Sequence, residues 1–180
     1  MNDTLEEVRN NRGWFLGLGV LLLLLGILAL GSTVFTTLFT VAFLGSLLLV
    51  SGIVKVVYSF WARRWGGFFA SLVTGLLYLV TGALILWQPG PAAVALTLLI
   101  AILFLVSGIA KILGSLTLRF QEWGWVLFSG VVSLVLGGLL IAAWPLSGLW
   151  AIGVFVGIDL IVLGWTWIIL AMGAKRLPNR

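Results

Sequence analysis

Residues 49–55 read Leu-Val-Ser-Gly-Ile-Val-Lys, and residues 105–111, which lie 56 positions later, read Leu-Val-Ser-Gly-Ile-Ala-Lys. A more divergent third copy follows after another 56 positions, where Gly164 keeps the glycine while Leu163 and Trp167 replace the serine and the lysine. Similarity at a fixed period indicates a chain built from repeated structural units. The sequence therefore predicts three repeats, at about residues 14–64, 65–122 and 123–172.

The composition indicates a membrane protein. Of the 180 residues, 62% are hydrophobic and only 8% are charged, whereas roughly a quarter of the residues in soluble domains are charged. A helix that crosses the hydrocarbon core needs roughly 20 residues, and six apolar runs meet this length, at residues 14–34, 35–57, 68–87, 92–113, 123–144 and 149–172. The predicted fold is therefore all-α, an integral membrane six-helix bundle built from three parallel helical-hairpin repeats.

The basic residues follow the predicted topology. They lie in the N-terminal segment 1–13, at or after the second and fourth helices, and in the C-terminal tail 173–180. The connections after the first, third and fifth helices carry no charge. The positive-inside rule then predicts a multi-pass protein with both termini in the cytoplasm. We interpret these charges as topology signals for the lipid bilayer rather than as a surface that binds nucleic acid.

The chain contains neither cysteine nor histidine. Their absence excludes disulfides, thiol nucleophiles, imidazole bases and the usual ligand sets for soft metals. We therefore predict no catalytic residue, no cofactor and no metal site.

Small residues spaced seven apart form a second pattern. Residues seven apart lie on one face of a helix after two turns, so a small pair leaves a groove for close packing of a neighbouring helix, which is the main attraction between helices in lipid. Each predicted helix carries one such pair, and we predict a helix-packing role for all twelve: Gly19, Gly26, Gly45, Gly52, Gly75, Gly82, Ala101, Gly108, Gly130, Gly137, Gly157 and Gly164.

Two features of the N-terminal part allow alternatives. Residues 4–7 fit a capping box for a short helix, with a frayed tail as the alternative. The leucine-rich run at residues 21–25 resembles the core of a signal peptide. Because Gly19 and Gly26 align with Gly75 and Gly82 of the next repeat, we interpret the first helix as a retained part of the fold.

Asp159 is the acidic residue inside a predicted span, near the middle of the sixth helix, and its repeat equivalents are Leu47 and Leu103. An ionised Asp at a helix centre costs about 2.5–3.5 kcal/mol on insertion scales, so pairing, hydration or protonation is expected. Asp159 lies roughly opposite the face of Gly157 and Gly164. It is our candidate for a proton-responsive group, and the alternative is a neutral, hydrogen-bonded Asp that fixes packing.

Lys55 and Lys111 each lie three residues after the second small residue of their helix, near the predicted cytoplasmic edge. One interpretation is that they snorkel to the headgroups, and the other is that they face anionic lipid or other anions. Five hydroxyl residues are expected to form hydrogen bonds between helices, namely Ser71, Thr74, Thr81, Ser129 and Ser133.

Together, the three helix pairs, the repeated Ser-Gly-Ile-x-Lys ending, the Trp-x-Pro and Trp-Pro turns and the ladder of small residues resemble the HdeD family of bacterial membrane proteins. The resemblance covers about residues 14–172. It implies a protein of the bacterial plasma (inner) membrane that is linked to acid resistance and stress and has no enzymatic activity. It supplies no catalytic residues, and Trp167 departs from the lysine of the first two repeats.

Three classes of function follow. The first is a non-enzymatic HdeD-like protein that supports acid or general stress tolerance. The second is a small proton-responsive transporter or channel that uses Asp159. The third is an accessory subunit of a membrane complex, and small-residue grooves on every helix also make a homo-oligomer or a membrane-protein partner plausible.

Overall fold

The computed structural model describes residues 12–61, 65–118 and 122–173, and these residues are helical throughout apart from short connections. The described residues form six long helices and one 3-10 helix, η1, in this chain order: α2 (Arg12–Gly31), α3 (Thr33–Ser59), α4 (Trp65–Trp87), α5 (Pro89–Leu118), α6 (Trp123–Ala142), η1 (Leu146–Leu149) and α7 (Ala151–Gly173). All six long helices are apolar and long enough to cross a membrane, which confirms the predicted fold class. The expected capping box at residues 4–7 lies outside the described residues.

The connection between α4 and α5 is shorter than the sequence predicted. Only Gln88 separates α4 from α5, which begins at Pro89 rather than at Ala92. Proline is favoured at the first position of a helix, because the backbone N–H that it lacks would make no hydrogen bond within the helix there. Only Ser32 separates α2 from α3, and its hydroxyl donates to the carbonyl of Leu28 at 2.8 Å.

The last connection contains structure that the sequence did not indicate. The 3-10 helix η1 precedes α7, which therefore begins at Ala151 instead of Leu149. The Ser147 hydroxyl donates to the carbonyl of Leu140 at 2.8 Å. A Cβ at Gly148 would lie 2.5 Å from the Cα of Val94, so only glycine lets η1 approach α5 this closely.

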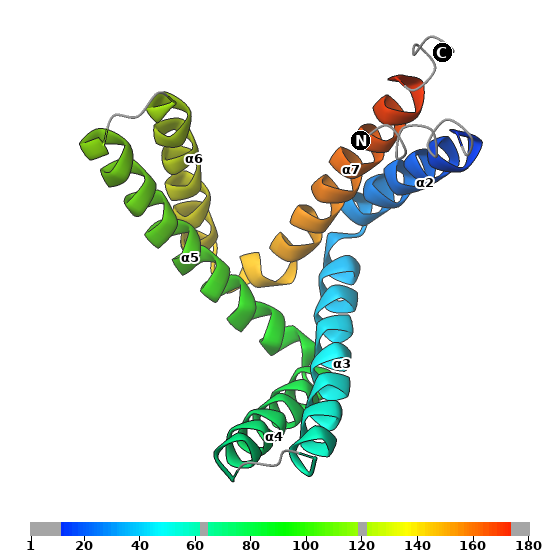
Figure 1. The fold of residues 1–180 in the computed structure, drawn as a ribbon. Coiled ribbons are helices and arrows are strands. Elements are labelled where there is room, and N and C mark those ends of the chain that lie inside the picture. Colours follow the sequence, from blue (N-terminus) through cyan, green and yellow to red (C-terminus); the bar gives the residue numbers. More distant parts are fainter. Residues whose placement is uncertain (1–11, 62–64, 119–121, 174–180) are drawn as a thin grey trace, which may run out of the picture. The chain divides into compact units, whose positions relative to one another are not determined.

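The chain divides into two compact units. Residues up to Thr36 and from Gly153 onward form one unit, in which α2 lies along α7 (Figure 1). The other unit contains Thr37–Ile152, in which α3 lies along α4 and α5 lies along α6 (Figure 1). In each of the three pairs, the second helix of one sequence repeat contacts the first helix of another repeat.

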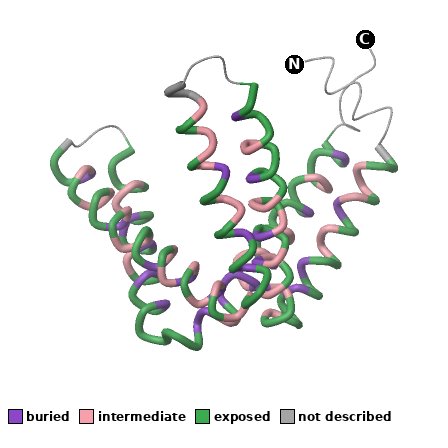
Figure 2. Tube along the Cα trace, turned by 90° about the horizontal axis from the view of Figure 1, so that it is seen from below, coloured by how far each residue is buried: buried purple, intermediate pink, exposed green. Residues whose placement is uncertain are grey.

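The interior consists of small side chains. In the described part of the chain, the largest side chains that are fully buried are those of Val41, Thr37, Thr97, Ser59, Ser115 and Ser147. Large apolar residues face outward on every helix, so exposed positions dominate the tube in Figure 2. This distribution suits lipid, because surrounding hydrocarbon removes the penalty for exposing leucine and close backbone contact becomes the main attraction between helices.

Candidate functional site

The α2–α7 pair is held by reciprocal contacts between glycines. A Cβ added to Gly19 would lie 3.0 Å from the carbonyl oxygen of Gly164, and one added to Gly164 would lie 2.8 Å from the carbonyl oxygen of Gly19. Gly26 and Gly157 repeat this arrangement at 2.9 and 3.2 Å. Because 19 pairs with 164 and 26 pairs with 157, the two helices run antiparallel. Such close approach also permits weak Cα–H···O contacts between the helices.

The other two pairs have the same geometry. A Cβ on Gly52 would lie 3.0 Å from the carbonyl oxygen of Gly75, and one on Gly108 would lie 2.8 Å from that of Gly130. The α5–α6 pair contains one alanine, Ala101, whose carbonyl oxygen would lie 2.9 Å from a Cβ on Gly137. The same contact therefore joins the helices three times along the chain.

All twelve residues of the predicted ladder are buried. The buried line also continues for one more heptad, to Ser59 in α3, Ser115 in α5 and Ala171 in α7. These three residues were missed in the sequence, although each lies seven positions after a ladder glycine. Extending the seven-residue spacing to serine and alanine would have found them.

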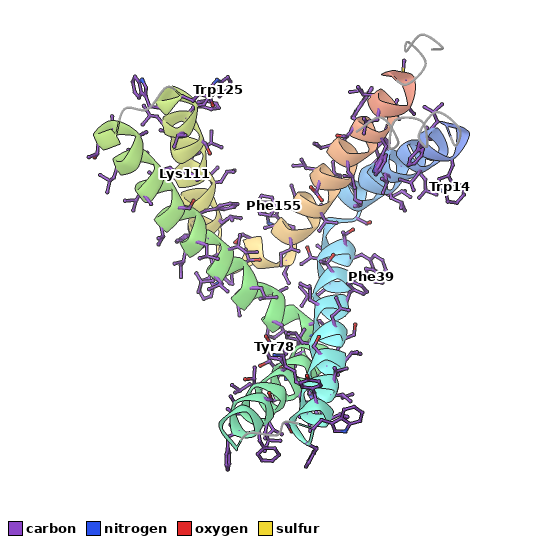
Figure 3. The ribbon with its side chains drawn as sticks, in the orientation of Figure 1. Trp14, Phe39, Tyr78, Lys111, Trp125 and Phe155 are labelled. Carbon is purple, nitrogen blue, oxygen red and sulfur yellow. The ribbon has the colours of Figure 1, made fainter. Side chains whose placement is uncertain are left out.

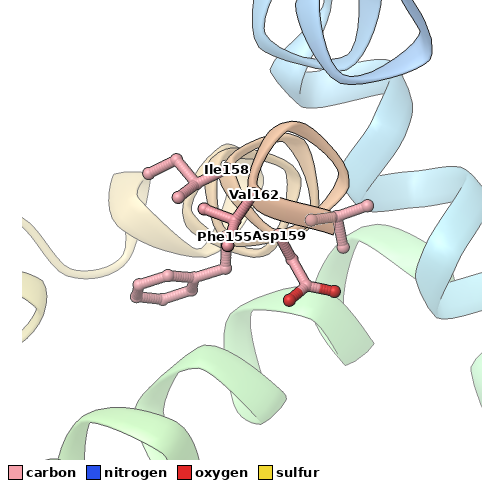
Figure 4. A pocket seen from close by; sticks show the side chains of 5 residues that line it. Phe155, Ile158, Asp159 and Val162 are labelled. Atoms are coloured by element: carbon pink, nitrogen blue, oxygen red, sulfur yellow. The ribbon is translucent and has the colours of Figure 1, made fainter. Parts of the chain in front are cut away.

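Asp159 lies on the exposed surface of α7, away from the glycines that face α2. It lines a shallow, open hollow together with Phe155, Val156, Ile158 and Val162, all of which belong to α7. Figure 4 shows the Asp159 carboxylate and the Phe155 ring projecting from α7 in different directions. Within the described segments, Asp159 has no hydrogen-bond or salt-bridge partner.

Lys55 and Lys111 each reach across to the partner helix of their pair. The Lys55 Nζ lies 5.1 Å from the centre of the Tyr78 ring on α4. The Lys111 Nζ donates a hydrogen bond to the Ser129 hydroxyl on α6 at 3.1 Å. Figure 3 labels Tyr78 and Lys111. Both lysines are half-buried. Although they occupy equivalent positions in the repeat, Lys55 lies over an aromatic ring and Lys111 bonds to a hydroxyl.

The third repeat replaces this lysine with an aromatic contact. Trp167 of α7 stacks on Phe15 of α2, with ring centres 5.3 Å apart and planes inclined by 16°. Offset-stacked rings attract each other beyond the area that they bury. A ring of three equivalent lysines is therefore absent from the described residues.

Two of the five hydroxyl residues that were expected to link helices bond within their own helix instead. Thr74 donates to the carbonyl of Ala70, and Ser133 donates to the carbonyl of Ser129 at 2.8 Å. The expectation was wrong for these two because a Ser or Thr on a helix can reach the carbonyl four residues back, which competes with interhelical partners. Ser129 does link two helices, but as the acceptor for Lys111.

Comparisons with known proteins agree with this architecture. The family model described as "Short repeat of unknown function (DUF308)" matches the chain twice, over residues 17–87 and 73–142. Proteins called "Protein HdeD" from Escherichia coli (strain K12), Escherichia coli O157:H7 and Shigella flexneri are each 25% identical over 160 residues, which cover 87% of this chain and 84% of theirs. No solved structure matches the chain.

Each family match begins in one helix and includes the glycine-paired hairpin that follows it, α3–α4 in the first match and α5–α6 in the second. The repeated contact described above therefore falls within the repeat that the family model recognises. On these grounds the chain belongs to the DUF308 repeat family, the family of HdeD-type membrane proteins.

Proposed function

We propose that this protein is an HdeD-like integral membrane protein that supports acid or general stress tolerance without enzymatic activity. The observation that carries the proposal is the similarity to HdeD over 87% of the chain. The three glycine-paired helix pairs support it further, because two of them fall within the repeat that the family model recognises. Such a protein would act through the integrity or assembly of the membrane.

The proposed location is the bacterial plasma (inner) membrane, with both termini in the cytoplasm. The placement of the lysines and arginines after the second and fourth helices supports this orientation. Reporter fusions at Gly90 and Arg119 test it, since these residues belong to opposite sides of the membrane under this topology.

Survival at low pH tests the proposed function. We expect a strain that lacks the gene to survive acid challenge less well than its parent, and the wild-type gene supplied in trans to restore survival. Complementation with Gly138→Ala should restore survival as well as the wild-type gene does, because no atom lies within 4 Å of a Cβ at that position. This variant is the control for a substitution that the fold tolerates. Equal survival of deletion and parent strains at every cell density would refute the proposal.

A second candidate function is favoured by Asp159. Its carboxylate has no partner within the described segments and lies among apolar side chains about 12 Å along α7 from the first residue of the helix. A carboxylate at such a depth marks ion or proton pathways in many membrane proteins. A small proton-responsive transporter or channel is therefore the alternative, and an accessory role in a larger complex would show as co-purification with a partner.

Proton flux in liposomes separates this alternative from the first proposal. If Asp159 carries protons, wild-type protein dissipates an imposed pH gradient, and Asp159→Asn abolishes the flux because the amide takes no proton at neutral pH. Thr166→Val is the matched control on the same helix, since the Thr166 hydroxyl bonds only to its own helix, at the carbonyl of Val162. Liposomes that stay as tight as empty ones with all three proteins would remove the transport candidate.

A further inference from the structure

Neither candidate function assigns a role to one polar cluster on the surface of the described residues. It lies where the C-terminal part of α5 meets the N-terminal part of α6, and it consists of Lys111 and Ser129, with Trp125 one helical turn before Ser129. Figure 3 labels Lys111 on α5 and Trp125 near the start of α6. The cluster combines a cation, a hydroxyl and an indole ring at one end of a helix pair.

The cation is held in place and keeps spare hydrogen-bond donors. The Lys111 Nζ donates one hydrogen bond, to the Ser129 hydroxyl at 3.1 Å, and an ammonium has three donors. The Lys111 Cβ would lie 3.1 Å from a Cβ on Gly130, so this glycine makes room for the base of the lysine side chain. The hydroxyl proton of Ser129 finds no acceptor among the described residues, which leaves a second donor beside the ammonium.

No acidic residue neutralises this charge within the described segments. Their acidic residues are Glu122 and Asp159, and neither forms a salt bridge or hydrogen bond with Lys111. An ammonium with free donors and a neighbouring hydroxyl suits the oxygens of a phosphate group. Lys111 and Ser129 therefore present hydrogen-bond donors of the kind that such an anion accepts from.

The depth of the cluster indicates where that anion would come from. The 30 residues of α5 extend about 45 Å, which exceeds the roughly 30 Å of the hydrocarbon core. Lys111 lies about 10 Å before the end of α5, which places it near the boundary between hydrocarbon and headgroups.

An apolar hollow lies on α6, near the turn that precedes Ser129. Gly124, Trp125 and Phe128 line it, and the Trp125 ring packs edge-on against Phe128 with centres 6.2 Å apart. Trp125 is 74% exposed and lies one turn from Ser129 on the same face of α6. An indole at the membrane interface buries its ring and keeps its N–H near water, so the hollow suits the glycerol and upper acyl chain of a lipid.

The equivalent lysine shows that the repeat alone does not create this cluster. At the corresponding place in the α3–α4 pair, the Lys55 Nζ lies over the Tyr78 ring. The hydroxyl that corresponds to Ser129 belongs to Thr74, which already donates to the carbonyl of Ala70. Lys55 therefore lacks the free hydroxyl and provides an internal control.

We propose that Lys111 and Ser129, with Trp125 one turn away on α6, form a binding site for the phosphate group of an anionic phospholipid. The ammonium and the hydroxyl donate to the phosphate oxygens, and the hollow beside Trp125 accepts the glycerol end of the acyl chains. The same polar groups suit inorganic phosphate, but only a lipid also fills the hollow. This site is independent of the stress-tolerance function.

Native mass spectrometry of delipidated protein tests the site, with phosphatidylglycerol, phosphatidylcholine and inorganic phosphate added in separate arms. We expect Lys111→Gln to weaken phosphatidylglycerol binding by about five- to tenfold, because one interfacial cation contributes on the order of a tenfold change in affinity. Ser129→Ala should weaken it less, Lys55→Gln should leave this site intact, and Lys111→Arg should restore binding. A Lys111→Gln protein that keeps the wild-type melting temperature separates a loss of binding from a loss of folding.

Three outcomes would overturn the proposal. The first is an equal loss in Lys111→Gln and Lys55→Gln, which would indicate a general effect of charge. The second is equal binding of phosphatidylcholine, which would show that the anionic headgroup is not recognised. The third is displacement of the lipid by inorganic phosphate alone, which would assign the groups to a soluble anion.

Discussion

Gly137→Ala is expected to lower the free energy of unfolding by about 1–3 kcal/mol, the usual cost of adding a methyl group to a filled interior. Its Cβ would lie 2.9 Å from the carbonyl oxygen of Ala101 and 3.0 Å from the Leu105 Cγ. The carbonyl belongs to the backbone of α5, so relief requires the two helices to separate. Ala101 already occupies the groove opposite Gly137, and this leaves little room for a second methyl group. Reversible unfolding in detergent micelles measures the change.

The neighbouring glycine provides the control for this prediction. No atom lies within 4 Å of a Cβ at Gly138, and alanine favours helix over glycine by up to about 1 kcal/mol. Gly138→Ala should therefore leave stability unchanged or raise it slightly. Since both substitutions make the same chemical change at adjacent positions of α6, their difference isolates the contact with α5. Equal stabilities of the two variants would contradict the packing role of Gly137.

Removing α2 is expected to have the second large effect, because α7 would lose the helix that covers Gly157 and Gly164. A chain that begins at Ser32 should fail to accumulate in detergent-soluble form. Co-expression of a separate peptide of residues 1–31 should rescue it, since preformed membrane helices can associate without a covalent link. Co-purification of the tagged peptide with the shortened chain measures this association.

Variants of the peptide show whether the glycines carry the association. Gly19→Leu combined with Gly26→Leu should reduce co-purification at least about tenfold, because each substitution inserts side-chain atoms into a filled contact. Gly17→Leu is the matched control, as no atom lies within 4 Å of a Cβ at that position. If the double variant and Gly17→Leu bind equally well, the antiparallel glycine contact does not hold α2 to α7.

The surroundings of Lys111 and Asp159 could be predicted from the sequence less well than the helices and their small-residue spacing. Lys111 was recognised as a cation near a helix end, but its hydrogen bond with Ser129 depends on how two helices are rotated about their axes. The repeat even suggested that Lys55 and Lys111 are equivalent, whereas Tyr78 lies beside one and Ser129 beside the other. Asp159 was recognised as unusual from its apolar neighbours alone, but its exposure on α7 depends on which face α2 covers.

The sequence by itself determined the helices, their membrane-spanning character, the repeat and the small residues that face neighbouring helices. These properties depend on local composition and on periodicity along a single helix, which the chain records directly. Only the tertiary structure decided which grooves meet. Each hairpin repeat was expected to be a unit, yet the grooves join the second helix of one repeat to the first helix of another, including α7 to α2. Because all six helices carry the same seven-residue spacing, the pattern alone cannot distinguish partners, and the choice rests on how the whole chain packs.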